Sequence, residues 1–112
     1  WGDFALFRTE LMKTTKLDAS SWSTASDFYD ALLSAIGAPD WHGRNINAVV
    51  DSMVFGGINT LQPPYAVTVV NVAQLSEPIK TEVVLLADAI QEARKDRYAR
   101  TGKDVIVSLQ LD

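Results

Sequence analysis

The residues best suited to chemistry lie in the eleven-residue segment Trp41–Asp51, which reads Trp-His-Gly-Arg-Asn-Ile-Asn-Ala-Val-Val-Asp. It holds the only histidine of the chain, His42, and it ends on an acid, Asp51. With Ser52 these are the side-chain types of a Ser-His-Asp hydrolase, so nucleophilic catalysis is the first chemistry to weigh. However, neighbouring residues of a helix point about 100° apart, and no nucleophile-elbow sequence surrounds Ser52. The pattern therefore argues against an enzyme.

Metal and cofactor sites lack their usual residues as well. With one histidine and no cysteine, the chain does not supply the nitrogen and sulfur ligands typical of zinc. No acidic run has the spacing of a calcium loop, and Gly43, Gly56 and Gly57 are not placed as a phosphate-binding loop requires. We therefore expect no metal and no cofactor.

The same segment has the pattern of a protein-binding surface. If it forms a loop followed by a helix, Asn47 and Asp51 are four residues apart and share one helix face. Trp41 and His42 precede them as a pair of aromatic side chains that we expect outside, because loop aromatics often anchor interfaces. The alternatives are that Trp41 packs on the edge of the core and that His42 and Asp51 are merely solvated. As a binding surface, the segment would face a basic partner.

Composition narrows the class of protein. The chain of 112 residues is 47% hydrophobic and 21% charged, which suits one globular domain with a real core. The absence of cysteine fits a reducing compartment, so we expect a cytoplasmic protein. We expect no membrane association, because no apolar run is long enough to span a bilayer and no leader is visible, although the chain begins at Trp1.

The charge balance bears on the partner. The net charge is −4, from 14 acidic and 10 basic residues. A negative protein is a poor direct ligand for nucleic acid, because phosphate binding needs a positive field. The same charge is compatible with a basic protein partner.

Hydrophobic periodicity and capping residues predict six elements. They are a strand at about 13–17, helices at 26–36 and 46–55, a strand at 65–72, a long helix at 78–100 and a strand at 104–111. Thr24 with Asp27 has the spacing of a capping box, and Asn45 is the expected N-cap of the second helix. This order, with long helical crossovers, predicts an α/β domain with a parallel sheet. Residues 1–12 form an N-terminal extension, either one helix face or an extended arm, ahead of a domain at 13–112.

Three stretches resemble the barstar family of intracellular inhibitors of microbial ribonucleases. They are Thr15–Asp18, Asp27–Leu32 and above all Gly37–Asp51, a motif with paired aromatics and a Gly-x-Asn step before the second helix, whose last motif residue is the acid Asp51. Weaker similarity continues at Pro64–Val67, Gln91–Arg94 and Asp104–Leu111. The resemblance implies a barstar-like three-stranded parallel sheet flanked by helices.

The resemblance also implies a mode of action. Family members press the second helix and its preceding loop into the active site of a ribonuclease. The acid that takes the place of the substrate phosphate matches Asp51, the loop aromatic matches Trp41, and an acid on the rim matches Glu92. Two positions depart from the family pattern, because Asn47 stands where an acid is usual and Val50 where tryptophan is usual. The connection Phe55–Pro64 is also longer than in compact members.

We therefore expect a protein inhibitor of a microbial ribonuclease, acting as an immunity protein against a toxin. The expected partner is a basic ribonuclease or toxin domain, bound one-to-one by a chain that is monomeric when free. The alternative is a barstar-like interaction domain with a toxin that is not a ribonuclease, or a regulatory protein, as its target. The expected contact residues are Trp41, His42, Gly43, Arg44, Asn47, Val50, Asp51 and Glu92.

Overall fold

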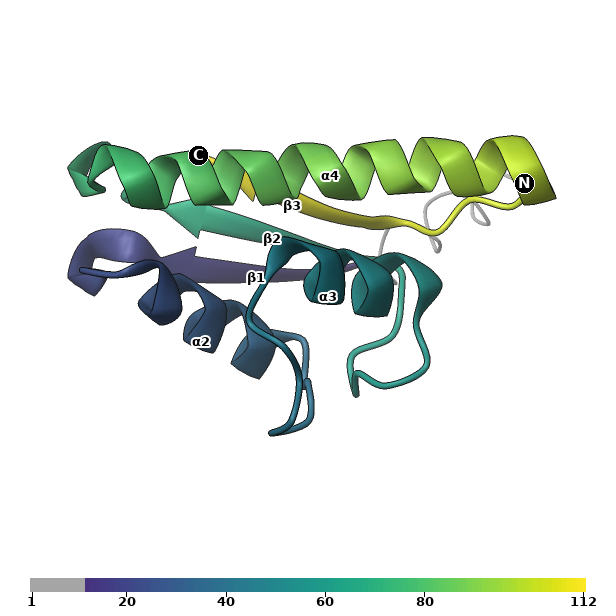
Figure 1. Ribbon diagram of the computed structural model, residues 1–112, viewed down its shortest axis with the longest axis horizontal. Coiled ribbons are helices and arrows are strands. Elements are labelled where there is room, and N and C mark those ends of the chain that lie inside the picture. Colours follow the sequence, from purple (N-terminus) through teal and green to yellow (C-terminus); the bar gives the residue numbers. More distant parts are fainter. Residues whose placement is uncertain (1–11) are drawn as a thin grey trace.

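The computed structural model describes residues 12–112, as a three-stranded sheet with three helices (Figure 1). The strands are β1 (Lys13–Asp18), β2 (Tyr65–Val70) and β3 (Val107–Leu111), parallel and in the order β1-β2-β3. The helices are α2 (Ala25–Ala35), α3 (Ile46–Val50) and α4 (Glu77–Thr101), and 3-10 turns lie at Ala19–Ser21 and Val72–Gln74. The predicted α/β fold with a parallel sheet is confirmed.

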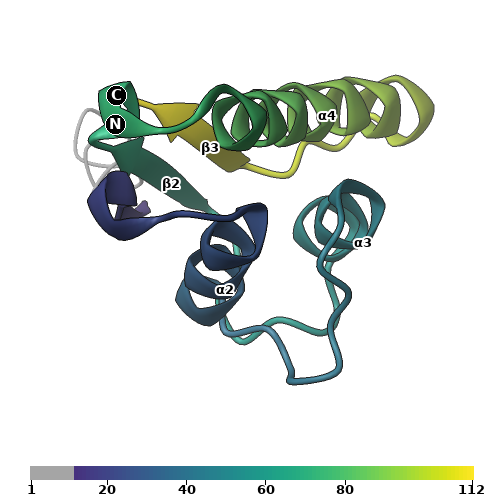
Figure 2. The same cartoon turned by 60° about the vertical axis from the view of Figure 1, so that its left-hand side comes forward.

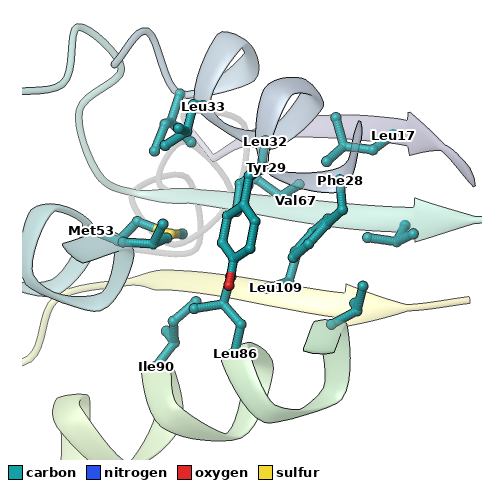
Figure 3. Close-up of a cluster of buried hydrophobic side chains, with 14 of the residues drawn as sticks. Leu17, Phe28, Tyr29, Leu32, Leu33, Met53, Val67, Leu86, Ile90 and Leu109 are labelled. Carbon is teal, nitrogen blue, oxygen red and sulfur yellow. The ribbon is translucent and has the colours of Figure 1, made fainter. Parts of the chain in front are cut away.

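One face of the sheet carries the core. Alternate residues of a strand point to the same face, and on the face toward the helices the buried residues are apolar: Leu17, Val67, Val69, Val107 and Leu109. On the other face, the polar residues Lys16, Thr68 and Gln110 are adjacent in register, and Ala66 and Val70 of β2 lie on the same face. Figure 3 shows Leu17, Val67 and Leu109 packed with side chains of α2 and α4, and Met53 closing the cluster from the helix that follows Asn45.

Helix α2 is well specified by its sequence. Thr24 Oγ1 accepts from the Asp27 N–H, and the Asp27 carboxylate accepts from the Thr24 N–H, so the predicted capping box is present. Backbone N–H groups of Ser23 and Thr24 donate to this carboxylate and hold the pKa of Asp27 below its usual range. The helix ends at Ala35, and Gly37 follows two residues later with a φ of +68°, which suits glycine.

Tyr29 links α2 to α4, a contact that periodicity does not predict. Its ring is buried in the core, and its hydroxyl donates to Glu82 Oε1 over 2.5 Å. Figure 3 shows this oxygen pointing from α2 toward α4. Burial, and secondarily the nearby Glu82 carboxylate, raise the pKa of Tyr29. The tyrosine is thus held neutral in the layer between the two helices.

Two strand boundaries differ from the prediction. Strand β2 ends at Val70 rather than at residue 72, because Asn71 adopts a left-handed conformation (φ 62°) and donates to Asp18 Oδ1. Strand β3 begins at Val107 rather than at residue 104, because the Asp104 carboxylate is bound by Arg94 before the chain joins the sheet. In both cases a side-chain contact from a distant segment sets the boundary.

The second helix begins as predicted but changes its winding. Asn45 Oδ1 accepts from the Ala48 N–H over 2.8 Å and caps α3. From Asp51 to Phe55 the helix continues as a π-helix, a rare geometry that recurs at functional sites. The long helix predicted at 78–100 is confirmed as α4, and no helix within residues 12–112 is long and apolar enough to cross a membrane. The predicted N-terminal extension, residues 1–12, cannot be compared with the structure, because residues 1–11 lie outside the described part of the chain.

Candidate partner-binding site

The loop between α2 and α3 and the connection from the π-helix to β2 lie on the same side of the molecule (Figures 1 and 2). Backbone hydrogen bonds join them, since the Thr60 N–H donates to Gly37 O over 2.9 Å and the Leu61 N–H donates to Ile36 O over 3.0 Å. Gly37 is required at this crossing, because a Cβ there would lie 2.6 Å from Thr60 Cβ. The loop that carries Trp41 therefore rests on the connection behind it.

Trp41 and the helix that follows present an exposed surface. The Trp41 side chain is 73% exposed, so the alternative that it packs on the core edge is wrong. Asn47 and Asp51 are both exposed, as their spacing on one helix face predicted. Phe55, the last residue of the π-helix, is also 49% exposed, a position that the sequence did not single out. We call the exposed residues Trp41, Gly43, Arg44, Asn47 and Asp51 the binding face.

His42 is the clearest correction among the expected contact residues. It is 6% exposed, so it is neither solvated nor part of an outward aromatic pair. Its Nδ1 lies 2.7 Å from Gly43 O and its Nε2 lies 2.7 Å from Ser52 Oγ. Both ring nitrogens therefore have partners inside the protein, and His42 supports the binding face from beneath.

The contact between His42 and Ser52 does not make a hydrolase site. Ser52 is 4% exposed, and its hydroxyl also contacts Asn59 Nδ2 and Val49 O, so no substrate reaches it. The carboxylate that such a site needs is missing, because Asp51 is exposed and the other ring nitrogen faces a carbonyl. Ser52 and Asn59 were not predicted from the sequence. The sequence did contain one sign of the role of Ser52: it is a polar residue at a position that helical spacing places on the buried side of the helix.

The positive charge of the binding face, on Arg44, is compensated by a neighbouring acid. Arg44 forms an ion pair with Asp30 of α2 through Nε and Nη2, with the Nε–Oδ1 distance at 2.8 Å. Asp51 forms no ion pair with any described residue. Its carboxylate therefore remains available to a cationic partner.

Val50 and Glu92 lie at the margins of this surface. Val50 is half-buried and packs against the core, so it offers only part of its side chain. Glu92 lies on α4, which packs against α3, and its side chain is 76% exposed beside Lys95. Within residues 12–112, no group of three or more histidine, cysteine or acidic residues is placed to hold a metal ion.

A family model described as Barstar (barnase inhibitor) matches residues 12–110. The chain therefore belongs to the barstar family, whose fold is the three-stranded parallel sheet with helices seen here. Barstar family proteins are inhibitors and not enzymes, which confirms that the chain is not an enzyme. A search among curated proteins finds no match.

Proposed function

We propose that this protein inhibits a barnase-type ribonuclease by covering the active site of the enzyme with the binding face. The observation that carries the proposal is the exposed carboxylate of Asp51, which forms no ion pair with any residue in 12–112 and shares a helix face with Asn47, while the Trp41 ring is exposed on the preceding loop. A ribonuclease active site is cationic, because it binds a phosphodiester. A carboxylate presented on a rigid helix complements such a site in charge and in shape.

In the proposed complex, Asp51 takes the position of the substrate phosphate. Arginine side chains of the enzyme would donate charge-assisted hydrogen bonds to its carboxylate, and these are the strong bonds of such an interface. Trp41 would pack its ring against the rim of the active site, where rigid aromatic side chains bury a large area at low entropic cost. Glu92 would lie at the edge of the contact. Inhibition is then competitive occlusion with one inhibitor per enzyme.

Asn47 of the binding face and Val50 at its margin tune the choice of enzyme. Asn47 offers a neutral amide where the family has an acid, so it makes weaker bonds to cations. Val50 offers a small, half-buried surface where the family has tryptophan. We infer that the target has fewer cationic groups opposite α3 than barnase-type enzymes usually present.

The biological role that fits this mechanism is immunity within the cell that makes the ribonuclease, so the inhibitor would act in the cytoplasm as a monomer. A family member with another toxin or a regulatory protein as its target is the second candidate, which the departures at Asn47 and Val50 favour. Residues 13–112 would form the inhibitory domain, and residues 1–12 an addition to it.

The test is a titration of purified protein into barnase-type ribonucleases and other toxin domains, with RNA cleavage as the readout. We expect complete inhibition of one enzyme at a one-to-one ratio and no cleavage by the protein alone. Tight binding to a toxin that is not a ribonuclease would establish the second candidate. RNA hydrolysis by the purified chain, lost on substitution of Asp51, would contradict both.

A further inference from the structure

Behind the binding face, a buried chain of hydrogen bonds joins three segments. Asn59 Nδ2 donates to Ser52 Oγ over 3.0 Å, and Ser52 Oγ lies 2.7 Å from His42 Nε2. His42 Nδ1 in turn lies 2.7 Å from Gly43 O. These are the three buried polar residues of the described chain, with 4–6% exposure. Polar groups this deeply buried and mutually paired specify one geometry.

The acceptors determine the direction of these bonds. Gly43 O can only accept, so His42 Nδ1 carries a proton. With the proton on Nδ1, Nε2 accepts from the Ser52 hydroxyl, whose single proton is then directed along the 2.7 Å contact to Nε2 rather than the 3.2 Å contact to Val49 O. The Ser52 oxygen itself accepts from the Asn59 amide. All the donors therefore point the same way along the chain, and each bond polarises the next.

We propose that His42, Ser52 and Asn59 are positioning residues that fix the loop of Trp41 to the helix of Asp51 before a partner arrives. Their place in the sequence gives them this role. His42 stands between two residues of the binding face, and Ser52 directly follows Asp51. One hydrogen bond therefore sets the position of the loop aromatic relative to the acidic side chain. A surface arranged in advance loses less entropy on binding and so binds more tightly.

The connection Phe55–Pro64 gains a function in this arrangement. It supplies Asn59, and its Thr60 N–H holds the start of the loop through Gly37 O. Asn59 stays buried although its Oδ1 has no hydrogen-bond partner among the described residues. A buried unpaired oxygen is unfavourable for stability alone. Its retention supports a role for Asn59 in holding the loop.

Two substitutions of His42 separate the two contacts of its ring. In His42→Asn the side-chain amide matches Nδ1, so it keeps the contact with Gly43 O and loses Ser52. In His42→Gln the amide reaches the position of Nε2, so it keeps the contact with Ser52. The proposal predicts that His42→Asn loosens the loop and that His42→Gln preserves it. Ser52→Ala and Asn59→Ala cut the same chain at other points, and alanine at 52 suits a helix.

Two readouts need no partner and use the whole 112-residue chain. The first is amide exchange at His42, whose N–H donates to Pro39 O over 3.0 Å, with the amides of β2 as the reference for global stability. The second is trypsin cleavage after Arg44, with cleavage after Lys103 as an internal control in a distant exposed segment. For His42→Asn, Ser52→Ala and Asn59→Ala we expect both rates at the loop to rise about fivefold, the change that about 1 kcal/mol produces.

A third readout tests the effect on binding and rests on the proposed function. We expect the inhibition constant for the target ribonuclease to rise about fivefold in the same three variants, or about 1 kcal/mol, and His42→Gln to bind like the wild type. If the wild type inhibits no ribonuclease, the proposed function fails, while exchange and proteolysis still decide the positioning role. Loop exchange and cleavage that stay at wild-type rates in Ser52→Ala and Asn59→Ala would overturn the proposal.

Discussion

His42 Nε2 lies 2.7 Å from Ser52 Oγ, a contact between side chains ten positions apart in the sequence. This is the distance between nucleophile and base in many hydrolases, but here both groups are buried and bonded to other parts of the chain. The residues most suggestive of catalysis therefore join a loop to a helix. They lie beneath the surface that we propose as the inhibitory one, whose own exposed groups are Trp41 and Asp51.

Asp51→Ala should be the most damaging single change for binding while the fold is retained. Asp51 is exposed, so removing its carboxylate opens no cavity. Alanine also has a higher helix propensity than aspartate. In the complex its loss would leave cationic groups of the enzyme buried and unpaired, at a cost of about 2–5 kcal/mol. This range is the general cost of removing one partner of a buried charge pair at a protein interface, and the complexes on which it rests include one with barstar itself. Affinity and thermal unfolding should be measured in parallel.

Asn47→Ala is the matched control for that change, on the same helix face. Because the amide is neutral, we expect it to weaken binding less than Asp51→Ala does. An Asp51→Ala variant that binds like the wild type, or that loses affinity only by unfolding, would contradict the phosphate-mimic mechanism.

The association rate should fall as salt is added. The net charge is −4, and a cationic partner would be steered toward the binding face by the long-range field. That field is screened beyond about 30 Å at 0.01 M salt and about 10 Å at 0.1 M. Stopped-flow mixing should show a strong dependence of the on-rate and a weak dependence of the off-rate. A salt-independent on-rate would point instead to an apolar contact centred on Trp41.

Glu92→Ala should have a small effect on binding. The Glu92 side chain is 76% exposed and already lies 3.5 Å from the Lys95 ammonium group. Charges at a hydrated rim contribute about 1 kcal/mol or less, so the inhibition constant should rise only modestly. An effect larger than that of Asp51→Ala would place the centre of the interface on α4.

Gly37→Ala should destabilise the protein more than Gly102→Ala. Both glycines have positive φ, +68° and +72°, where alanine costs roughly 1–2 kcal/mol. Only at Gly37 does the new Cβ meet another residue, Thr60, at 2.6 Å, while nothing lies within 4 Å at Gly102. We expect a total cost of about 2–5 kcal/mol at Gly37, since overpacking adds about 1–3 kcal/mol. Urea unfolding of both variants tests this, and equal losses would show that the loop crossing tolerates the extra atom.

Stability in acid should depend on Asp104. Arg94 donates to both oxygens of its carboxylate and holds the pKa of Asp104 below its usual range. Because the folded pKa lies below the unfolded value of about 3.9, this stabilisation is present above about pH 4 and is lost as the pH falls through the folded pKa. Asp104→Asn should therefore lower the free energy of unfolding at pH 7, by at most about 1 kcal/mol for so exposed a pair.

The difference between wild type and Asp104→Asn should then shrink as the pH is lowered from 4 toward 2. Thermal unfolding across this range provides the measurement. Asp96→Asn, which removes the same charge from the more exposed ion pair with Arg100, is the control. A difference that stays constant with pH would contradict the link to the Arg94 pair.

Short-range sequence signals were sufficient to predict the helices of this protein and the exposed face of the second one. The capping box of Thr24 and Asp27, the Asn45 cap and the stop at Gly102 each involve residues a few positions apart, so they predicted the helices well. The four-residue spacing of Asn47 and Asp51 predicted their shared exposed face in the same way. The motif Gly37–Asp51 identified the family, which the match over residues 12–110 confirmed.

The tertiary structure alone decided how these elements meet. Tyr29 and Glu82 are 53 positions apart, and the contacts of Gly37 with Thr60 and of Ser52 with Asn59 cross a long connection. Local periodicity carries no signal for such pairs, because they depend on where the chain returns after each crossover. For the same reason, sequence reasoning placed His42 outside beside Trp41, whereas the fold buries it. A histidine next to a glycine can face either way, and here its two buried hydrogen-bond partners determine that it faces inward.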